Sequence, residues 1–260
     1  ETFNSSLLLL PIFFLLTEFT LDGISNIQGD FQCKDYSYVK EFVMPFIRVA
    51  GDMTIALNSG SVNTAAEIEF PKLQEIGGTL TLGTNRNANN ITFPLLKKIL
   101  GSCSVTTYKL KNDIEFTNLE SIGTDGADAQ IKFEIEATNI LCPKLKTING
   151  KFDIATSSFM FDMEVDKVSY PNVESISENL SITCPYSDFG SNGILSIDFS
   201  GLKSAKGISI SGQGDVTDFS SFKYLFENNV LTGESQWSVK ECGYNPTFQE
   251  MKDGKYKLAE

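Results

Sequence analysis

A phrase of the form Phe-Pro-x-Leu-x-x-Ile-x-Gly-x-Leu-x-Leu recurs along this chain, and its clearest copy runs from Phe70 to Leu82. Successive copies start about 20 to 29 residues apart. A phrase repeated at such a period is typical of a solenoid, because one turn cannot bury its own apolar side and must stack on its neighbours. The repeat therefore predicts stacked turns around one continuous interior.

Each copy opens on an anchor residue, which we count as place zero. Apolar residues follow at places three, six, ten and twelve, and glycine is frequent at place eight. Proline often follows the anchor and marks a corner, because it cannot donate to a strand ladder. Several copies are irregular. The proline after Val43 comes one place late, and residues 123–130 interrupt the copy after Phe116. The strand after Phe199 is one place out of register, and the pattern fades after Phe219. The predicted anchors are Leu21, Val43, Phe70, Phe93, Phe116, Cys142, Tyr170, Phe199 and Phe219.

The second half of each copy has the pattern of a strand. Apolar places ten and twelve alternate with polar places nine and eleven, which is the period of a strand with one buried side. Glycine at place eight predicts a positive φ or a tight bend. No amphipathic stretch long enough for a crossover helix lies between Leu21 and Ser211. These patterns predict a mainly β chain, a right-handed parallel β-solenoid; the alternative is an α/β domain with similar turns.

The chain divides into three expected parts: an N-terminal capping segment (1–20), the solenoid (21–229), and a C-terminal cap or tail (230–260). The apolar run 7–16 is too short to span a bilayer and lacks the charge and cleavage site of a signal peptide. Because a solenoid must cover the strand edges of its first turn, we expect this segment to cap it. At the other end, residues 218–229 have helical spacing, and the last aromatic residues are expected to fold over the final turn.

Composition excludes several classes of function. The net charge is −12 and the chain has no histidine, which argues against nucleic acid, anionic membranes, direct membrane insertion and histidine-based catalysis or metal binding. No phosphate-binding or dinucleotide-binding motif occurs, so we expect no cofactor and no metal. Of the five cysteines, Cys33, Cys103 and Cys142 replace apolar residues of the repeat. We interpret them as buried thiols and not as disulfides.

The phrase Phe-Pro-x-Leu-x-x-Ile-x-Gly-x-Leu resembles the receptor L-domain. That domain is the leucine-rich-repeat-like β-solenoid of insulin-type and EGF-type receptors and of some cell-wall proteins. The resemblance covers roughly residues 19–226, and the chain lacks the disulfide framework of the receptor domains. The stretches 236–239 and 244–247 also resemble the ends of surface leucine-rich-repeat proteins from gut Bacteroidota. The resemblance implies a solenoid that binds a ligand at the cell surface.

The outward places nine and eleven of the strands are the best candidate for a site. The candidate side chains are Asp52, Thr54, Thr79, Thr81, Ser102, Ser104, Lys151 and Asp153. The first four turns make a flat strip of small polar residues, and we expect the last turns to be charged, with Lys132 at place nine and Glu134 at place eleven of the interrupted copy. The loops after two later strands add aromatic residues, which anchor interfaces and stack on sugars: Phe159, Phe161, Tyr186 and Phe189. The alternatives are a solvated sheet face and aromatic residues that fold over the rim of the core.

The leading functional hypothesis is a non-enzymatic recognition or adhesion module that binds a protein or a glycan. A second hypothesis is a β-helix carbohydrate-active enzyme, which needs two carboxylates at a defined separation. Asp52 and Asp153 would be about 19 Å apart at ordinary strand spacing, too far to share one bond. A third hypothesis is a structural spacer. We expect the cell surface or the extracellular space, including a bacterial outer-membrane lipoprotein; the sequence leaves the oligomeric state open.

Overall fold

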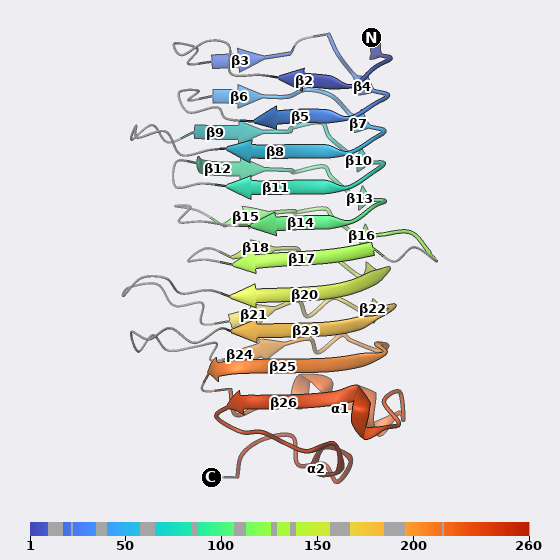
Figure 1. Ribbon diagram of the computed structural model, residues 1–260, viewed down its shortest axis with the longest axis vertical. Helices are drawn as coiled ribbons and strands as arrows, with labels where there is room; N and C mark the ends of the chain where they lie inside the picture. Colours follow the sequence, from blue (N-terminus) through green and yellow to red (C-terminus); the bar gives the residue numbers. More distant parts are fainter. Residues whose placement is uncertain are drawn as a thin grey trace.

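The computed structural model of the chain is a parallel β-solenoid with little helix (Figure 1). Its strands stack one above another along the length of the molecule, with the two ends of the chain at opposite ends of the stack. The structure describes residues 1–9, 18–21, 23–34, 41–57, 66–84, 88–106, 113–125, 129–135, 139–156, 167–184, 196–214 and 216–259.

Three parallel sheets form the sides of the solenoid. Sheet A contains β1 (Thr2–Phe3), β4 (Asn26–Ile27), β7 (Arg48–Val49), β10 (Glu75–Ile76), β13 (Lys98–Ile99), β16 (Ser121–Ile122), β19 (Thr147–Ile148) and β22 (Ser175–Ile176). Sheet B contains β2 (Leu7–Leu9), β5 (Phe31–Lys34), β8 (Met53–Leu57), β11 (Leu80–Thr84), β14 (Cys103–Thr106), β17 (Ala129–Ile135), β20 (Gly150–Thr156), β23 (Asn179–Cys184), β25 (Gly207–Gly214) and β26 (Trp237–Cys242). Sheet C contains β3 (Glu18–Thr20), β6 (Glu41–Val43), β9 (Ala66–Glu69), β12 (Ala88–Thr92), β15 (Ile114–Glu115) and β18 (Ile140–Leu141). From β3 to β20, each turn adds one strand to every sheet.

The interior is filled by equivalent residues of successive turns. The rings of Phe70 and Phe93 stack with centroids 4.9 Å apart, and those of Phe93 and Phe116 with centroids 5.0 Å apart. All three side chains are fully buried. This separation matches the distance of about 4.8 Å between neighbouring strands, so the aromatic column and the strand ladder have the same period. The predicted stacking of like positions is confirmed.

The register corrects two details of the predicted repeat. Val43 pairs with Glu69, so Met44 lies level with Phe70 and takes the buried anchor place that we assigned to Val43. The proline of this turn therefore follows its anchor directly, as in the turns that begin at Phe70, Phe93, Cys142 and Tyr170. In the interrupted copy, Lys132 pairs with Ser104 and belongs to place eleven.

Close approach of the backbone, and not a positive φ, explains the glycine at place eight. A Cβ on Gly101 would lie 2.6 Å from the carbonyl carbon of Gly78, and one on Gly78 would lie 2.8 Å from that of Gly51. None of these three glycines has a positive φ, whereas Gly123, beside the interruption, has a φ of +80°. Contact between turns therefore requires the repeated glycine.

The two ends of the solenoid differ. At the N-terminal end, β1 and β2 pair in parallel with β4 and β5, so sheets A and B begin before the predicted boundary at residue 21. Residues 10–17, which hold most of the apolar run 7–16, lie outside the described residues. The capping roles and the handedness of the solenoid stay predictions.

At the C-terminal end, the helix expected within residues 218–229 is present. It comprises the 3-10 turn η1 (Ser220–Phe222) and α1 (Lys223–Glu227), and it is followed by η2 (Glu234–Gln236), β26 and α2 (Phe248–Lys252). The Phe226 ring lies 5.1 Å from the Trp237 ring and 5.5 Å from the Phe248 ring. The indole Nε1 of Trp237 donates a 2.9 Å hydrogen bond to the carbonyl oxygen of Pro246. The terminal aromatic residues thus pack together against the last strand.

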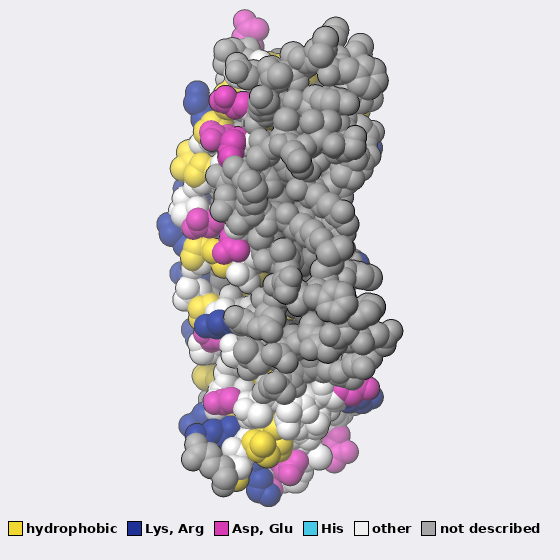
Figure 2. Space-filling model, turned by 90° about the vertical axis from the view of Figure 1, so that its left-hand side faces the viewer, with side chains coloured by type: hydrophobic (Ala, Val, Ile, Leu, Met, Phe, Trp, Pro, Cys, Tyr) yellow, Lys and Arg dark blue, Asp and Glu magenta, His cyan; other side chains and the backbone are white. Residues whose placement is uncertain are grey.

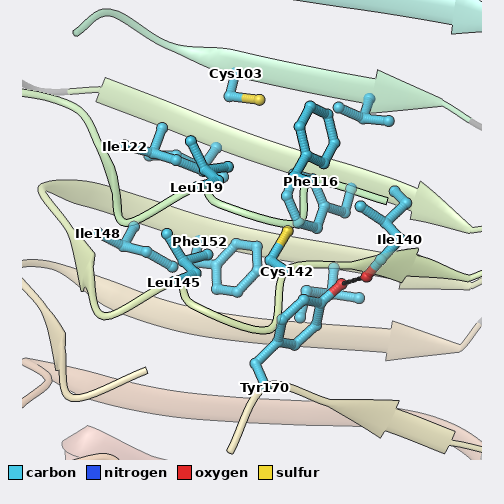
Figure 3. Close-up of a cluster of buried hydrophobic side chains, with 14 of the residues drawn as sticks. Cys103, Phe116, Leu119, Ile122, Ile140, Cys142, Leu145, Ile148, Phe152 and Tyr170 are labelled. Atoms are coloured by element: carbon cyan, nitrogen blue, oxygen red, sulfur yellow. Dashed lines mark hydrogen bonds between the residues drawn. The ribbon is translucent and has the colours of Figure 1, made fainter. Parts of the chain in front are cut away.

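Sheet C stops at β18, and the next two strands on this side, β21 (Lys167–Ser169) and β24 (Ser196–Asp198), pair only with each other. Figure 3 shows the interior beside this break. The Tyr170 hydroxyl donates a 3.0 Å hydrogen bond to the carbonyl oxygen of Ile140 across it. A pocket of about 130 Å³ lies there between residues 139–141 and 167–170.

Three cysteine thiols are buried as predicted. Cys33, Cys103 and Cys142 are free thiols within the core. Burial raises the pKa of the Cys103 thiol to about 12, and desolvation likewise raises the pKa of Cys142. These side chains therefore behave as small apolar residues, and the interior that they help to fill holds the strands of sheet B in register.

Candidate binding face

The outward side of sheet B carries a straight column of side chains at place eleven, which we call the hydroxyl column. Each member pairs in register with the next, and outside the charged pair at the centre most members are serine or threonine. Its described members are half-buried or exposed, in contrast to the buried residues on either side of them. The column runs Gln32, Thr54, Thr81, Ser104, Lys132, Asp153, Ser181, Ser209 and Ser238.

A second outward column, at place nine, links the turns to one another. The Asp30 Oδ1 atom accepts a 2.9 Å hydrogen bond from the backbone N–H of Asp52, and the Asp52 Oδ1 atom accepts one of 2.7 Å from Thr79. The Ser102 Oγ atom likewise accepts from the N–H of Gln130 at 3.0 Å. These side chains satisfy backbone donors where the next strand begins, which gives Asp52 and Ser102 a structural role.

The structure brings together the predicted strip from Asp52 to Asp153 on one face. The Lys151 Nζ atom lies 3.5 Å from the Asp153 Oδ2 atom, and Lys132 is the register partner of Asp153 on the neighbouring strand. We expected charged side chains on the last turns. Instead the charged residues form a central band, and small hydroxyl residues continue beyond it.

Two hydroxyl residues of this face were missed by the sequence reasoning. Ser209 and Ser238 extend the column along β25 and β26. The copy after Phe199 runs one place out of register, and the pattern fades after Phe219, so the spacing alone does not place these serines. The alternation Ile208, Ser209, Ile210 is the signal that could have found the first of them.

The face is close to neutral although the chain is strongly acidic. The charged residues at its outward places nine, eleven and thirteen are four lysines, three aspartates and one glutamate, whereas the net charge of the chain is −12: Lys34, Lys132, Lys151, Lys240, Asp30, Asp52, Asp153 and Glu134. Carboxylates gather elsewhere; on sheet C, Glu41 pairs directly with Glu67. The acidic excess therefore lies outside the hydroxyl column and its neighbours.

Another column alternates in charge from turn to turn, which we call the charge ladder: Lys97, Glu120, Lys146, Glu174 and Lys203. Backbone hydrogen bonds join each member to the preceding one. The Lys203 Nζ atom lies 2.8 Å from the Glu174 Oε2 atom, and this hydrogen bond and charge lower the pKa of Glu174. Figure 2 shows basic and acidic side chains interspersed along one edge of the molecule. Opposite charges on neighbouring turns favour the observed register.

The aromatic residues proposed for binding, Phe159, Phe161, Tyr186 and Phe189, lie outside the described residues. On the described part of the face, no aromatic side chain is exposed. Stacking on a sugar ring would therefore have to come from residues beyond the described strands.

Other features offer little for catalysis or metal binding. Within the described ranges, no group of three or more cysteine, aspartate or glutamate residues is arranged to hold a metal ion. No helix in those ranges is long and apolar enough to cross a membrane. A second pocket, of about 350 Å³, lies between β26 and residues 245–249, and the indole nitrogen of Trp237 beside it is already bonded to Pro246.

Asp52, which directly precedes β8, and Asp153 on β20 are separated by four strand spacings in sheet B, which is about 19 Å. Comparison with protein-family models, with curated proteins and with solved structures finds no match for this chain. The likeness to receptor L-domains therefore depends on the repeat phrase and on the solenoid architecture.

Proposed function

We propose that the chain is a non-enzymatic recognition module that binds a protein or a glycan on the outward face of sheet B, as an L-domain-like solenoid would. The single observation that carries the proposal is the face itself: flat, rich in small hydroxyl residues, and near neutral on an acidic chain.

The scaffold suits such a role. The inward residues of the same strands, such as Leu80 and Cys103, are fully buried, so the face rests on a close-packed interior. Sites supported by regular strands keep their geometry better than sites on loops, and a rigid face loses less entropy on binding. Outward residues such as Thr81 and Ser104 are therefore presented without a need for rearrangement.

The alternative, a β-helix carbohydrate-active enzyme, has less support on this face. Asp52 accepts a backbone hydrogen bond, Asp153 forms an ion pair with Lys151, and the two lie about 19 Å apart. A glycosidase needs its two carboxyl groups within about 5 to 10 Å of each other. A structural spacer would need no binding face, and it serves as the comparison in the experiment below.

The location proposed for the module is the cell surface or the extracellular space, of which an outer-membrane lipoprotein in bacteria is one form. The repeat phrase carries this proposal through its resemblance to receptor and cell-wall solenoids. The acidic composition is compatible with such a location.

Binding to a glycan array and a reducing-sugar release assay test the function together. We expect binding without turnover, and we expect Thr81→Arg to abolish binding because the long cation would project from the middle of the first run of hydroxyl residues, Thr54 to Ser104. Thr92→Arg is the matched control, since Thr92 faces outward on sheet C.

If the ligand is a protein, the same two variants are compared by pull-down against surface proteins of the source cells. Turnover that is lost on Asp52→Asn would favour the enzyme. Absence of both binding and turnover, together with an unchanged phenotype of Thr81→Arg, would favour the spacer.

A further inference from the structure

We propose that the outward face of sheet B binds a second copy of this chain, forming a two-fold symmetric dimer in which the two hydroxyl columns face each other. The inference rests on the proposed function in that it names a partner for the same face. What carries it is the order of charges along the column, because this order is self-complementary under a two-fold rotation.

The centre of the column lies between Lys132 and Asp153. Side chains at equal distances from this centre are similar in size, and the two charged ones are opposite in charge. Between β17 and β20, Lys132 is followed directly by Asp153. Three small hydroxyl residues precede this pair, and three follow it: Thr54, Thr81 and Ser104 on one side, Ser181, Ser209 and Ser238 on the other. The hydroxyl residues give a flat fit, and the charged pair sets the register.

A two-fold axis parallel to the strands and placed between β17 and β20 relates two such faces. The rotation keeps the direction of the strands and reverses the order of the turns. Lys132 of one copy then lies opposite Asp153 of the second copy, and the same contact recurs on the other side of the axis. An isologous contact of this kind needs a surface that is complementary to itself, and this face meets that condition.

The neighbouring residues are compatible with the same arrangement. In this register Lys151 of one copy lies opposite the uncharged Gln130 of the other, because the two are register partners across the same axis. Lys151 also lies 3.5 Å from Asp153 of its own copy, and Lys132 is the register partner of Asp153 in that copy. Each Asp153 would therefore lie near three cations, two of its own copy and Lys132 of the second copy. No described pair of like charges is placed in direct opposition near the axis.

The area available is sufficient for a dimer. The strands from β8 to β26 cover about 38 Å along the solenoid at ordinary strand spacing. Three outward columns make the face about 15 Å wide, so each copy would bury about 600 Å². The total of about 1,200 Å² is at the lower end of the range for specific protein interfaces.

The acidic charge of the rest of the chain opposes self-association, but it acts at longer range. Exposed charges separated by more than about 8 Å are largely screened at physiological ionic strength. Dimerisation is therefore best measured by sedimentation velocity at about 0.15 M salt, over protein concentrations from roughly 1 to 100 µM.

Two reciprocal variants test the proposal. Lys132→Asp places like negative charges opposite each other twice in a dimer, and Asp153→Lys places like positive charges there twice. We expect the dimer of each variant alone to be weaker than that of the natural chain by a factor of about ten or more. An equimolar mixture brings opposite charges together at both contacts, so we expect it to form a one-to-one heterodimer.

The matched controls are Lys72→Asp and Glu69→Lys, which make the same changes in charge at exposed positions on other sides of the solenoid. Circular dichroism checks that every variant remains folded. The controls are expected to dimerise like the natural chain.

Three results would overturn the dimer. These are a natural chain that stays monomeric over the whole concentration range, single variants that dimerise normally, and a mixture that stays as weak as its components. The chain could stay monomeric, bind a glycan or a foreign protein, and lose that binding on Thr81→Arg. This result would overturn the dimer and leave the proposed function intact. A dimer without any such foreign ligand would support the present inference alone.

Discussion

The two sides of sheet B follow different rules, although they are built by alternate residues of the same strands. On the inward side, residues such as Leu80 and Cys103 are fully buried, and they lie beside a column of phenylalanine rings. On the outward side, Thr81 and Ser104 stand in an equally regular column but face solvent. Burial requires the inward pattern, whereas packing does not require the outward hydroxyl residues. The outward side is therefore where a function can be selected without loss of the fold.

The largest expected difference between the two sides comes from removing one ring. Phe93→Ala should destabilise the fold by about 3–5 kcal/mol, because it leaves a cavity between the rings of Phe70 and Phe116. Thr81→Ala on the outward side should change the free energy of unfolding by less than about 0.5 kcal/mol. Urea denaturation followed by circular dichroism measures both, and similar losses for the two variants would contradict the comparison.

A smaller effect separates two glycines near the two ends of β11. Gly78→Ala should cost about 1–3 kcal/mol, because the new Cβ would lie 2.2 Å from Asp52 Oδ1 and 2.8 Å from the carbonyl carbon of Gly51. Gly83→Ala meets no atom within 4 Å and should be neutral or stabilising by up to about 1 kcal/mol. Thermal unfolding of both variants measures the change in stability, which should be a clear loss for Gly78→Ala and no loss for Gly83→Ala.

The contacts between turns on the outward side are expected to contribute less. Asp52→Ala removes the acceptor for the N–H of Thr79 and should cost about 1 kcal/mol, since the group is exposed to water. Asp52→Asn keeps an oxygen acceptor at the same place and should recover most of the loss. Equal stability of the natural chain and Asp52→Ala would show that water replaces this contact fully.

The smallest effect concerns the charge ladder. The hydrogen bond to Lys203 holds the pKa of Glu174 below its ordinary value in the folded state. Because the folded-state pKa is the lower one, this pair stabilises the fold above the ordinary pKa of glutamate, and the contribution is lost as the pH falls through the folded-state pKa. Glu174→Gln should therefore make the melting temperature slightly less dependent on pH between about pH 5 and pH 3, as measured by thermal unfolding at several pH values.

The repeat phrase was sufficient to predict the architecture because each copy places apolar residues at the same buried positions of a turn. Phe70, Phe93 and Phe116 stack as their spacing requires, and three cysteines fill apolar places. The prediction was wrong at Val43, because Met44 takes the buried place and the corner between the anchor and sheet A is one residue shorter, from Met44 to Val49. A shortened corner leaves the alternation of apolar and polar residues intact but moves the anchor by one residue. The spacing within one copy does not reveal this move.

The outward side was predicted less completely because its order depends on contacts between turns. The strip from Asp52 to Ser104 was identified from alternation within single strands. The backbone acceptor role of Asp52 and the reason for Gly78 involve the neighbouring turn, which one copy of the phrase does not specify. Ser238 was missed because β26 follows a helix and has no copy of the phrase in front of it.

The equal ring separations along the aromatic column imply that turns are interchangeable units of length. Excision of residues 71–93 would remove one period and leave Phe70 one step from Phe116, at a distance close to its present neighbour. Asp52 would then meet Ser102 where it now meets Thr79, which leaves it a backbone donor of the same kind. A protein built in this way can be made longer or shorter by whole turns, and the reach of its outer face would change in steps of one strand.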